Sequence, residues 1–371
     1  MTRRETLIAL SIVYAILTAK EDGRPARKPS LLRRVLRLFY MYWLSFRLVR
    51  EDLFKPLRSV WIINEDSYKA SFSAKKQIDK KNKAVLIPMG DMGYSGSTFF
   101  CTNDGAYLVK SVPRHFEHYF FKNEMLIPYA DHMRVNRSSL LVRITNFLES
   151  THKTIGTLLG LAPSHHIVME NILYGQDQGP KSKWESSDLK PTSYFFPERD
   201  IAGGALASQA TKSKLADEFN DKIRLSEAQA TEFQRQIEND TLLLANCNAV
   251  DYSLFLVRIS ALDAPTVESE PLIELEEAGD EPIPSVQLPF TPPNPPSWRT
   301  GVVSSDGREI YRASILDFFW AKHTIHAKAM TTLIRGYNLI DDQGPMSITT
   351  DSEEYRNRFL DMCKGLVEVQ G

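Results

Sequence analysis

A glycine-rich turn followed by a lysine is the first part of this sequence with chemistry to offer. The turn reads GDMGYSGS over 90–97 and links two predicted strands. Because glycine lacks a Cβ and permits positive φ, such a turn can bring backbone N–H groups close to phosphate oxygens. Lys110 ends the next apolar strand, in the order in which a kinase-like lobe presents its phosphate-binding lysine. An ordinary hairpin loop would explain the glycines alone, so it is the order that indicates a nucleotide site.

Aspartates in apolar surroundings supply the acidic groups that phosphoryl transfer needs. Asp251 opens the strand DYSLFLV, and Asp317 lies inside the apolar run SILDFFW. A carboxylate flanked by apolar residues is costly unless it is paired or binds a metal ion. Asp188 and Lys190 stand two residues apart and share one face if their segment is extended. A structural salt bridge explains any one of these residues alone.

The elements that must position these groups follow from periodicity and turn residues. Asp104-Gly105 between alternating apolar runs predicts a hairpin within 84–112. Apolar spacing further along predicts helices over 114–133 and 226–247, and strands over 139–148, 165–174 and 250–259. Nine prolines between 265 and 296, with one Arg against eight acidic residues over 261–300, predict a disordered acidic insert there.

The N-terminal region is basic, with 13 Lys and Arg against five Asp and Glu over 1–60. Apolar residues at three- and four-residue steps predict an amphipathic helix over 31–50, flanked by arginines. Such a helix can lie on an anionic membrane or pack against protein. The apolar run 6–17 is too short to span a bilayer and is expected to form a buried or interfacial helix rather than a signal peptide.

Composition excludes several other classes of protein. The 371 residues carry a formal charge of −1 and are 43% hydrophobic, which is typical of a folded chain of about two domains. Three widely spaced cysteines offer no disulfide framework and fit a reducing compartment. The eight histidines form no zinc set, because His165 and His166 point to opposite sides of a strand.

Taken in order, the motifs resemble those of the phosphatidylinositol phosphate kinase family, of the phosphatidylinositol-4-phosphate 5-kinase-like type. GYSGSTFF resembles its G-x-S-G-S loop, and YLVKSV resembles its ATP-lysine strand. SDLK, VDYSLFL and SILDFFW resemble its D-L-K-G-S, M-D-Y-S-L-L and I-I-D-I-L motifs. The resemblance covers roughly 50–260 and 301–368 and identifies the chain as a divergent member.

The resemblance implies an α+β fold of two lobes, distantly protein-kinase-like and similar to SAICAR synthase, with antiparallel sheets in both lobes. On this basis we expect a basic helical segment over 1–60, an ATP-binding lobe over 61–174 and a catalytic lobe over 175–371 that contains the insert 261–300. The basic segment fits the flat face that meets the membrane in this family.

The resemblance also assigns roles residue by residue. Lys110 would contact ATP phosphates, Asp251 would lie near the attacking hydroxyl, and Asp317 would hold Mg²⁺. Lys190 would help to neutralise phosphate charge, and Asp188, in the same motif, is also expected to be a catalytic residue. The loop residues expected to cover the nucleotide are Gly93, Ser95, Gly96 and Ser97. The helix after Lys110 offers Glu117 or Glu124 as its partner.

Departures from the family pattern concern the substrate side. Pro191 replaces the glycine after Lys190, and proline restricts φ and lacks an N–H. The segment after Asp317 has no Glu of the kind associated with regiochemistry, although Lys322 and Lys328 keep positive charge for an anionic head group. We therefore keep two alternatives open, a phosphoinositide-binding pseudokinase or scaffold and a soluble kinase of the wider fold.

The sequence thus predicts a kinase that uses ATP and Mg²⁺ to phosphorylate an inositol-ring hydroxyl of a membrane phosphoinositide, most simply as a 4-phosphate 5-kinase. The expected location is cytoplasmic and peripheral to a membrane. A homodimer is compatible with the sequence, and no nucleic-acid partner is expected.

Overall fold

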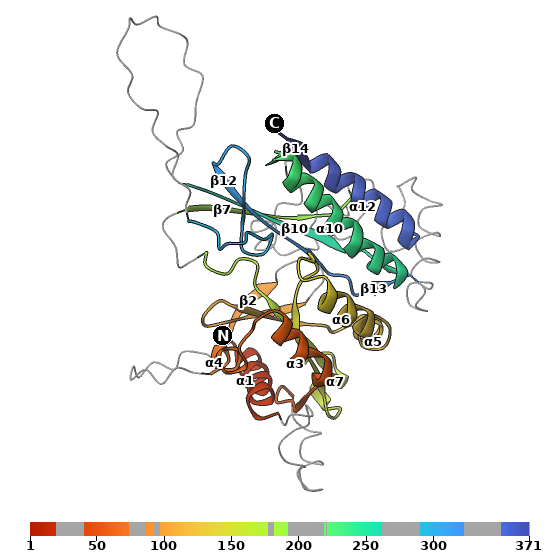
Figure 1. Cartoon of the computed structure of the whole chain (residues 1–371). Helices are drawn as coiled ribbons and strands as arrows, with labels where there is room; N and C mark the ends of the chain where they lie inside the picture. Colours follow the sequence, from red (N-terminus) through yellow and green to blue (C-terminus); the bar gives the residue numbers. More distant parts are fainter. Residues whose placement is uncertain are drawn as a thin grey trace, which may run out of the picture.

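Two antiparallel sheets carry most of the buried strands of the chain (Figure 1). The computed structural model describes residues 1–19, 41–73, 86–91, 97–176, 182–191, 219, 221–261, 290–322 and 350–370. The larger sheet has six strands in the order β1 (Phe46–Leu48), β5 (Ile144–Ser150), β6 (His165–Glu170), β4 (Tyr107–Ser111), β3 (Thr98–Thr102) and β2 (Leu86–Asp91). The smaller sheet has four, in the order β11 (Val302–Val303), β12 (Glu309–Leu316), β10 (Ser253–Ala261) and β7 (Ser182–Leu189).

Alternation along the strands gives the six-stranded sheet two buried faces. On β4, Leu108 joins one apolar cluster and Val109 joins another, as the two-residue repeat of a strand requires. The cluster with Val109 is covered by α1 (Arg3–Thr18) and α4 (Glu65–Ser71). The cluster with Leu108 is covered by α3 (Glu51–Val60), α5 (His115–Phe120), the π-helical turn η1 (Phe121–Met125) and α6 (Leu126–Val135).

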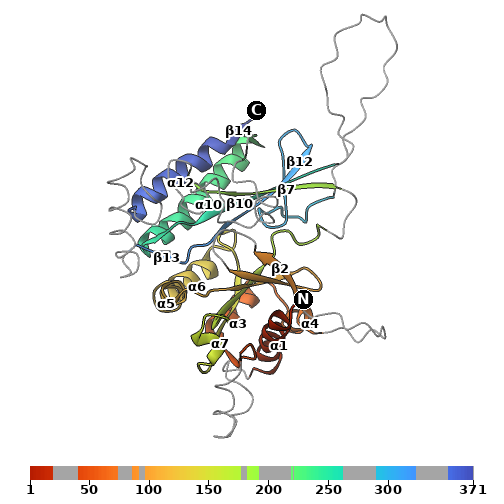
Figure 2. The same ribbon diagram turned by 180° about the vertical axis from the view of Figure 1, so that it is seen from behind.

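Helices α10 (Glu227–Asn246) and α12 (Ser352–Leu366) lie side by side over the smaller sheet (Figure 2). Helix α10 begins at a capping box in which Ser226 and Gln229 bond reciprocally, and it buries Phe233, Ile237 and Leu244 at helical spacing. The remaining short elements are α7 (Ile155–Leu158) and the pairs β9 (Ala249–Val250) with β13 (Trp320–Ala321) and β8 (Ile223–Leu225) with β14 (Val367–Val369).

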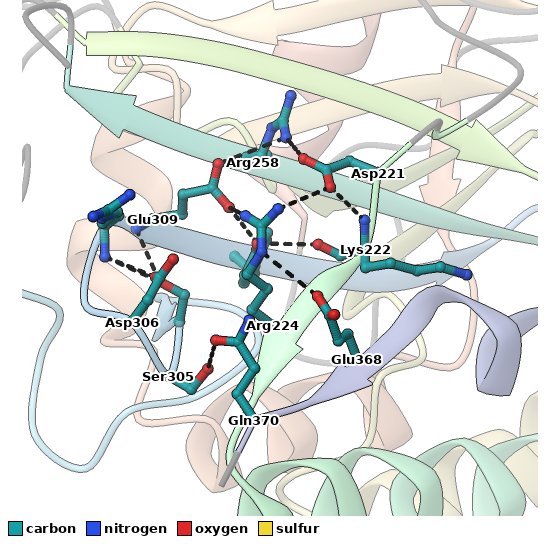
Figure 3. Close-up of polar contacts among 12 residues, drawn as sticks. Asp221, Lys222, Arg224, Arg258, Ser305, Asp306, Glu309, Glu368 and Gln370 are labelled. Atoms are coloured by element: carbon teal, nitrogen blue, oxygen red, sulfur yellow. Dashed lines mark hydrogen bonds and ion pairs between the residues drawn. The ribbon is translucent and has the colours of Figure 1, made fainter. Parts of the chain in front are cut away.

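A charged network fastens β8 and β14 to the smaller sheet (Figure 3). Arg258 on β10 contacts Asp221 at 2.5 Å, and Arg224 on β8 lies 3.7 Å from Glu309 on β12. Arg224 also lies 3.6 Å from Glu368 on β14. Each arginine thus lies among carboxylates, as expected of a structural ion-pair network.

The two sheets are joined directly through the segment before β5. The backbone N–H of Ile315 on β12 donates to the Leu140 carbonyl at 2.7 Å, and the N–H of Val142 donates to the Ile315 carbonyl at 3.1 Å. One apolar cluster accordingly continues from the larger sheet into the smaller. Within the described ranges, no helix is both long and apolar enough to cross a bilayer.

Most of the predicted elements are present, with shifted ends. The hairpin at Gly105 is confirmed, with φ +75° at that glycine, and the long helix is confirmed as α10. The helix expected over 114–133 is interrupted by η1. The strand expected over 250–259 is divided into β9 and β10.

The predicted helix over 31–50 is wrong in the part that the structure describes. Phe46–Leu48 form β1, which pairs with β5 at the edge of the six-stranded sheet. Residues 31–40 lie outside the described residues. Within β1 the burial instead follows a two-residue alternation, in which Phe46 and Leu48 are buried and Arg47 between them is exposed.

The acidic insert was also predicted to extend too far. Residues 262–289 lie outside the described residues, but 290–300 are described, and although 293–296 are exposed, 297–300 are buried or partly buried. Trp298 is 5% exposed and its ring lies 4.3 Å from that of Phe233. The prediction rested on the proline and acidic content of the segment and did not take account of Trp298.

Arg58 on α3 is the most completely buried charge of the larger sheet region, with 1% of its side chain exposed. It pairs with Glu51 and, at 2.7 Å, with Glu65, and it donates to the Thr145 carbonyl of β5 at 2.7 Å. We expect Arg58→Met to lower the free energy of unfolding by about 3–5 kcal/mol, because Glu51 would remain buried without its cation. Urea denaturation followed by circular dichroism measures this change.

Arg134→Met is the matched control, because Arg134 forms an exposed i,i+3 pair with Asp131 on α6. Its expected effect is below about 1 kcal/mol. Equal losses of unfolding free energy in the two variants would contradict the stabilising role assigned to the Arg58 cluster.

Candidate active site at the junction of the two sheets

Lys110 projects from β4 toward the smaller sheet. Its side chain is 7% exposed, and its Nζ forms an ion pair with Asp317. The Nζ also lies 5.4 Å from the ring centroid of Phe99 and 6.0 Å from that of Phe319, within reach of a weak cation–π attraction. The lysine and the aspartate are 207 residues apart in the chain, so only the packing of the two sheets brings them together.

Asp251 and Asp317 occupy matching irregularities between paired strands. Ser253 is opposite Leu316 in the β10–β12 ladder, and Val250 is opposite Trp320 in the β9–β13 pair. Both aspartates therefore fall in the short gap between the two ladders, where the strands depart from regular pairing.

Each of these aspartates has a left-handed backbone conformation, with φ +65° at Asp251 and +62° at Asp317. Left-handed conformations cost energy for residues other than glycine, although aspartate tolerates them better than most. Strained conformations of this kind concentrate at functional sites. The strain marks this gap as the candidate site.

Lys190, the residue directly after β7, completes the site. Its Nζ lies 3.0 Å from Asp251 Oδ1, and both side chains are about three-quarters buried, with 23% and 25% exposed. Buried Pro191 follows Lys190 directly. The site therefore contains two lysine–aspartate pairs, Lys110 with Asp317 and Lys190 with Asp251.

The surrounding charges shift the pKa values of these groups in opposite directions. Burial and the nearby Asp317 carboxylate raise the pKa of Asp188, and Lys190 only partly offsets them. Burial also acts to raise the pKa of Asp317, but Lys110 and Lys190 outweigh it and the pKa is lowered. Burial opposes the charge of Lys190, yet Asp251, Asp188 and Asp317 raise its pKa. Lys190 thus favours its charged form in the presence of the carboxylates.

The Oδ1 atom of Asp188 is shielded from solvent and accepts no hydrogen bond from the residues that the structure describes. An unpaired buried carboxylate oxygen beside Asp317 is a suitable ligand for a hard cation. Mg²⁺ is commonly held by one or two carboxylates together with substrate phosphates. Within the described ranges, no three His, Cys, Asp or Glu side chains gather as a metal site, so an all-protein cage is not formed there.

Glu117 lies on α5 beside this site, with 13% of its side chain exposed, and contacts Arg114 at 3.3 Å. Burial raises its pKa, although the charges of Arg114 and Lys110 act against the shift. Lys110 therefore acts on Glu117, one of the two glutamates considered from sequence. Glu124 acts on Cys247, whose pKa is raised mainly by burial.

The remaining predicted site residues are placed only in part. Gly93, Ser95, Gly96 and Lys328 lie outside the described residues. Ser97 is buried immediately before β3. Lys322 follows β13 and contacts Asp351, the N-cap of α12, at 3.2 Å.

Sequence reasoning missed the aromatic side of the site. Phe99 and Phe319 flank the Lys110 amine, and Phe318 and Phe319 are buried beside Asp317. The two consecutive phenylalanines after Asp317 were a signal that the aspartate is anchored on its C-terminal side.

Comparison with known proteins matches most of the chain to one family. A family model described as Phosphatidylinositol-4-phosphate 5-Kinase matches residues 80–366. A phosphatidylinositol 4-phosphate 5-kinase of Plasmodium falciparum is 30% identical over 95 residues, which is 25% of this chain and 5% of that protein. A probable phosphatidylinositol phosphate kinase of Dictyostelium discoideum is 26% identical over 204 residues, which is 52% of this chain and 24% of that protein.

Replacing Asp188 with asparagine tests the electrostatics of the site. The pKa of Asp188 is raised in the folded state, so its ionised form costs stability above that pKa and costs nothing below the unfolded value of 3.8. We expect Asp188→Asn to be more stable than the parent at pH 8, by on the order of 1 kcal/mol. The difference should shrink as the pH falls toward 4. Urea denaturation at a series of pH values measures it.

Asp221→Asn is the control with the opposite sign. Burial opposes ionisation of Asp221, but the Lys222 N–H, Arg224 and Arg258 together lower its pKa. Its carboxylate therefore stabilises the fold above the unfolded pKa of 3.8, and this contribution is lost as the pH falls through the lowered value. An Asp188→Asn variant that is less stable than the parent at pH 8 would contradict the assignment of Asp188.

Proposed function

Because this chain belongs to the phosphatidylinositol-4-phosphate 5-kinase family, we propose that it is an active lipid kinase. It would transfer the γ-phosphate of ATP to an inositol-ring hydroxyl of a membrane phosphoinositide, most simply the 5-hydroxyl of the 4-phosphate. The observation that carries this proposal is the meeting of two lysine–aspartate pairs, Lys110 with Asp317 and Lys190 with Asp251, at one junction. Phosphoryl transfer depends on such positioned charges more than on covalent chemistry.

The side chains of the site divide three tasks among them in the proposed reaction. Lys110 and Lys190 neutralise the phosphate charge, and the raised pKa of Lys190 keeps its ammonium form. Asp251 orients the attacking hydroxyl and accepts its proton, and its ion pair with Lys190 holds the carboxylate in position. Asp317 and the unpaired Oδ1 of Asp188 would hold Mg²⁺, which supplies further charge neutralisation when bound.

The same proposal gives the two sheets their roles. Strands β2 to β6 of the larger sheet would belong to the ATP-binding lobe over 61–174, with β1 added at the edge from the segment 1–60. The smaller sheet would belong to the catalytic lobe over 175–371, in the two-lobed arrangement similar to SAICAR synthase. Gly93, Ser95, Gly96 and Ser97 would cover the nucleotide, and Glu117 would assist Lys110. The basic region 1–60, with Lys322 and Lys328, would favour an anionic membrane surface.

A binding protein without turnover is the second candidate, and Pro191 is the observation that favours it. Pro191 is buried directly after Lys190, and it fixes φ where the family motif has glycine. Displacement of Lys190 from the transferred phosphate would leave lipid binding without catalysis. The two candidates differ in turnover, which can be measured.

Asp251→Asn and Asp317→Asn test the proposed chemistry. We expect each change to lower phosphate transfer to phosphatidylinositol 4-phosphate in vesicles by at least about 100-fold, because one removes the proton acceptor and the other a metal ligand. Asparagine keeps the size and the tolerance for a left-handed backbone. Transfer is measured with labelled ATP, and circular dichroism checks the fold.

Asp131→Asn serves as the control, because Asp131 is an exposed residue of α6 paired with Arg134. Undiminished transfer in both site variants would refute the proposal. Vesicle binding by the parent without turnover on any phosphoinositide would instead favour the scaffold. Resolving the positional isomers of the product identifies the hydroxyl that is phosphorylated.

A further inference from the structure

A cavity of about 580 Å³ lies beside the segment 171–176 that follows β6. Both sheets contribute residues to its wall, and residues of the segment 290–300 also line it. Its charged lining residues are Arg143, Glu170, Arg299 and Arg312. Its aromatic lining residues are Tyr107, Tyr174, Trp184 and Phe290. The volume is in the range of pockets that hold small molecules.

Strand alternation separates this cavity from the candidate active site. Tyr107 on β4 is directly opposite Glu170 on β6, so the two share a face of the sheet. Lys110 is an odd number of residues from Tyr107 and projects from the other face. On the smaller sheet, Trp184 precedes Asp188 by four residues of β7, which is roughly 13 Å along a strand. Lys110, Lys190, Asp251 and Asp317 do not line the cavity.

The lining carries an excess of positive charge. Arg299 forms an ion pair with Glu170, and its Nη2 donates to the Ser139 and Leu141 carbonyls at 2.5 Å. Arg312 uses Nη1 to donate to the Ile172 and Tyr174 carbonyls at 3.0 and 2.7 Å. Carbonyls are neutral, so three guanidinium groups face a single carboxylate and leave a formal charge of +2.

Several guanidinium nitrogens in this wall lack a hydrogen-bond partner. Within the described part of the chain, the Nε atoms of Arg143, Arg299 and Arg312 are buried and donate to no acceptor. The Arg299 side chain is 8% exposed, so water does not compensate it freely. A buried donor without a partner costs free energy, and a buried charge costs more.

The pKa values agree with this picture. Burial, with the charge of Arg143 added, lowers the pKa of Arg299 well below its usual range. Burial also lowers the pKa of Arg143, and it lowers that of Arg312 to about 10. An anion in the cavity would reverse these shifts by supplying both charge and acceptors.

We propose that this cavity binds a phosphate monoester, separately from the active site. A phosphate monoester carries nearly two negative charges near neutral pH and several strong acceptor oxygens, which match the +2 lining and its unpartnered N–H groups. Guanidinium groups bind phosphate in a bidentate manner. The aromatic side chains Tyr107, Trp184 and Phe290 would contact the organic part of the molecule.

Isothermal titration calorimetry on the full chain, in buffer free of phosphate and sulfate, tests this proposal. The probes are inorganic phosphate, adenosine monophosphate and inositol 1-phosphate. We expect submillimolar binding that Arg143→Gln weakens at least about tenfold, the size expected for one charge-assisted hydrogen bond. Arg143 is chosen because its guanidinium packs over the Trp61 ring at 5.5 Å rather than tying backbone segments together.

Matched variants separate the cavity from other sources of binding. Arg134→Gln removes the same charge at an exposed pair on α6 and should leave the affinity unchanged. Lys110→Met alters the candidate nucleotide site and should also leave it unchanged. Arg143→Lys keeps the charge but not the bidentate geometry, so an intermediate affinity is expected, and it replaces Arg143→Gln if that variant fails to fold.

The outcomes decide the proposal directly. Tighter binding of the two esters than of phosphate supports it together with the aromatic contact, and equal binding supports the phosphate group alone. Absence of binding for all three probes overturns it. Affinity that is unchanged in the Arg143 variants, or that is lost in Lys110→Met, also overturns it.

Discussion

The ion pair between Lys110 and Asp317 is the contact on which the candidate site depends. It joins the six-stranded sheet to the end of β12, and it places a buried ammonium beside a carboxylate held in a left-handed conformation. A buried charge of this kind is tolerated only when its partner is correctly placed. The electrostatics of the site therefore depend directly on how the two sheets pack together. Leu140 and Val142, which bond to Ile315, keep that packing in register.

The backbone around the aspartates shows how the site is positioned. The β10–β12 ladder ends at Ser253 and Leu316, and β9–β13 resumes at Val250 and Trp320. Ladders on both sides hold the gap, so the strain at Asp251 and Asp317 is compensated by regular pairing nearby. The carboxylates consequently project together without needing a long loop to position them.

The two charged regions at the junction contain opposite kinds of unpartnered hydrogen-bonding group. In the candidate active site, Asp188 retains an unpaired acceptor, which suits a cation. In the cavity beside 171–176, Arg143, Arg299 and Arg312 retain unpartnered donors, which suit an anion. By contrast, the network around Arg224 and Arg258 pairs each arginine with carboxylates and connects strands (Figure 3). Unpaired buried groups, rather than the number of charges, distinguish candidate sites from structural ion pairs.

The sequence by itself determined the local elements and the order of the chemical groups. Apolar spacing over 226–247 predicted α10, Asp104-Gly105 predicted the hairpin, and the order of Lys110, Asp188, Asp251 and Asp317 indicated the family. These features depend on neighbouring residues or on the order of motifs, so they can be predicted without knowing how the chain packs.

Only the tertiary structure decided what depends on distant contacts. The edge strand β1 forms because β5 offers it a partner, which overrides the helical spacing of its residues. The pairing of Lys110 with Asp317 and of Lys190 with Asp251 rests on the junction of the sheets, as does the convergence of the cavity arginines. Local sequence constrains backbone conformation within a few residues, whereas the field around a buried charge is set by neighbours that packing brings from elsewhere in the chain.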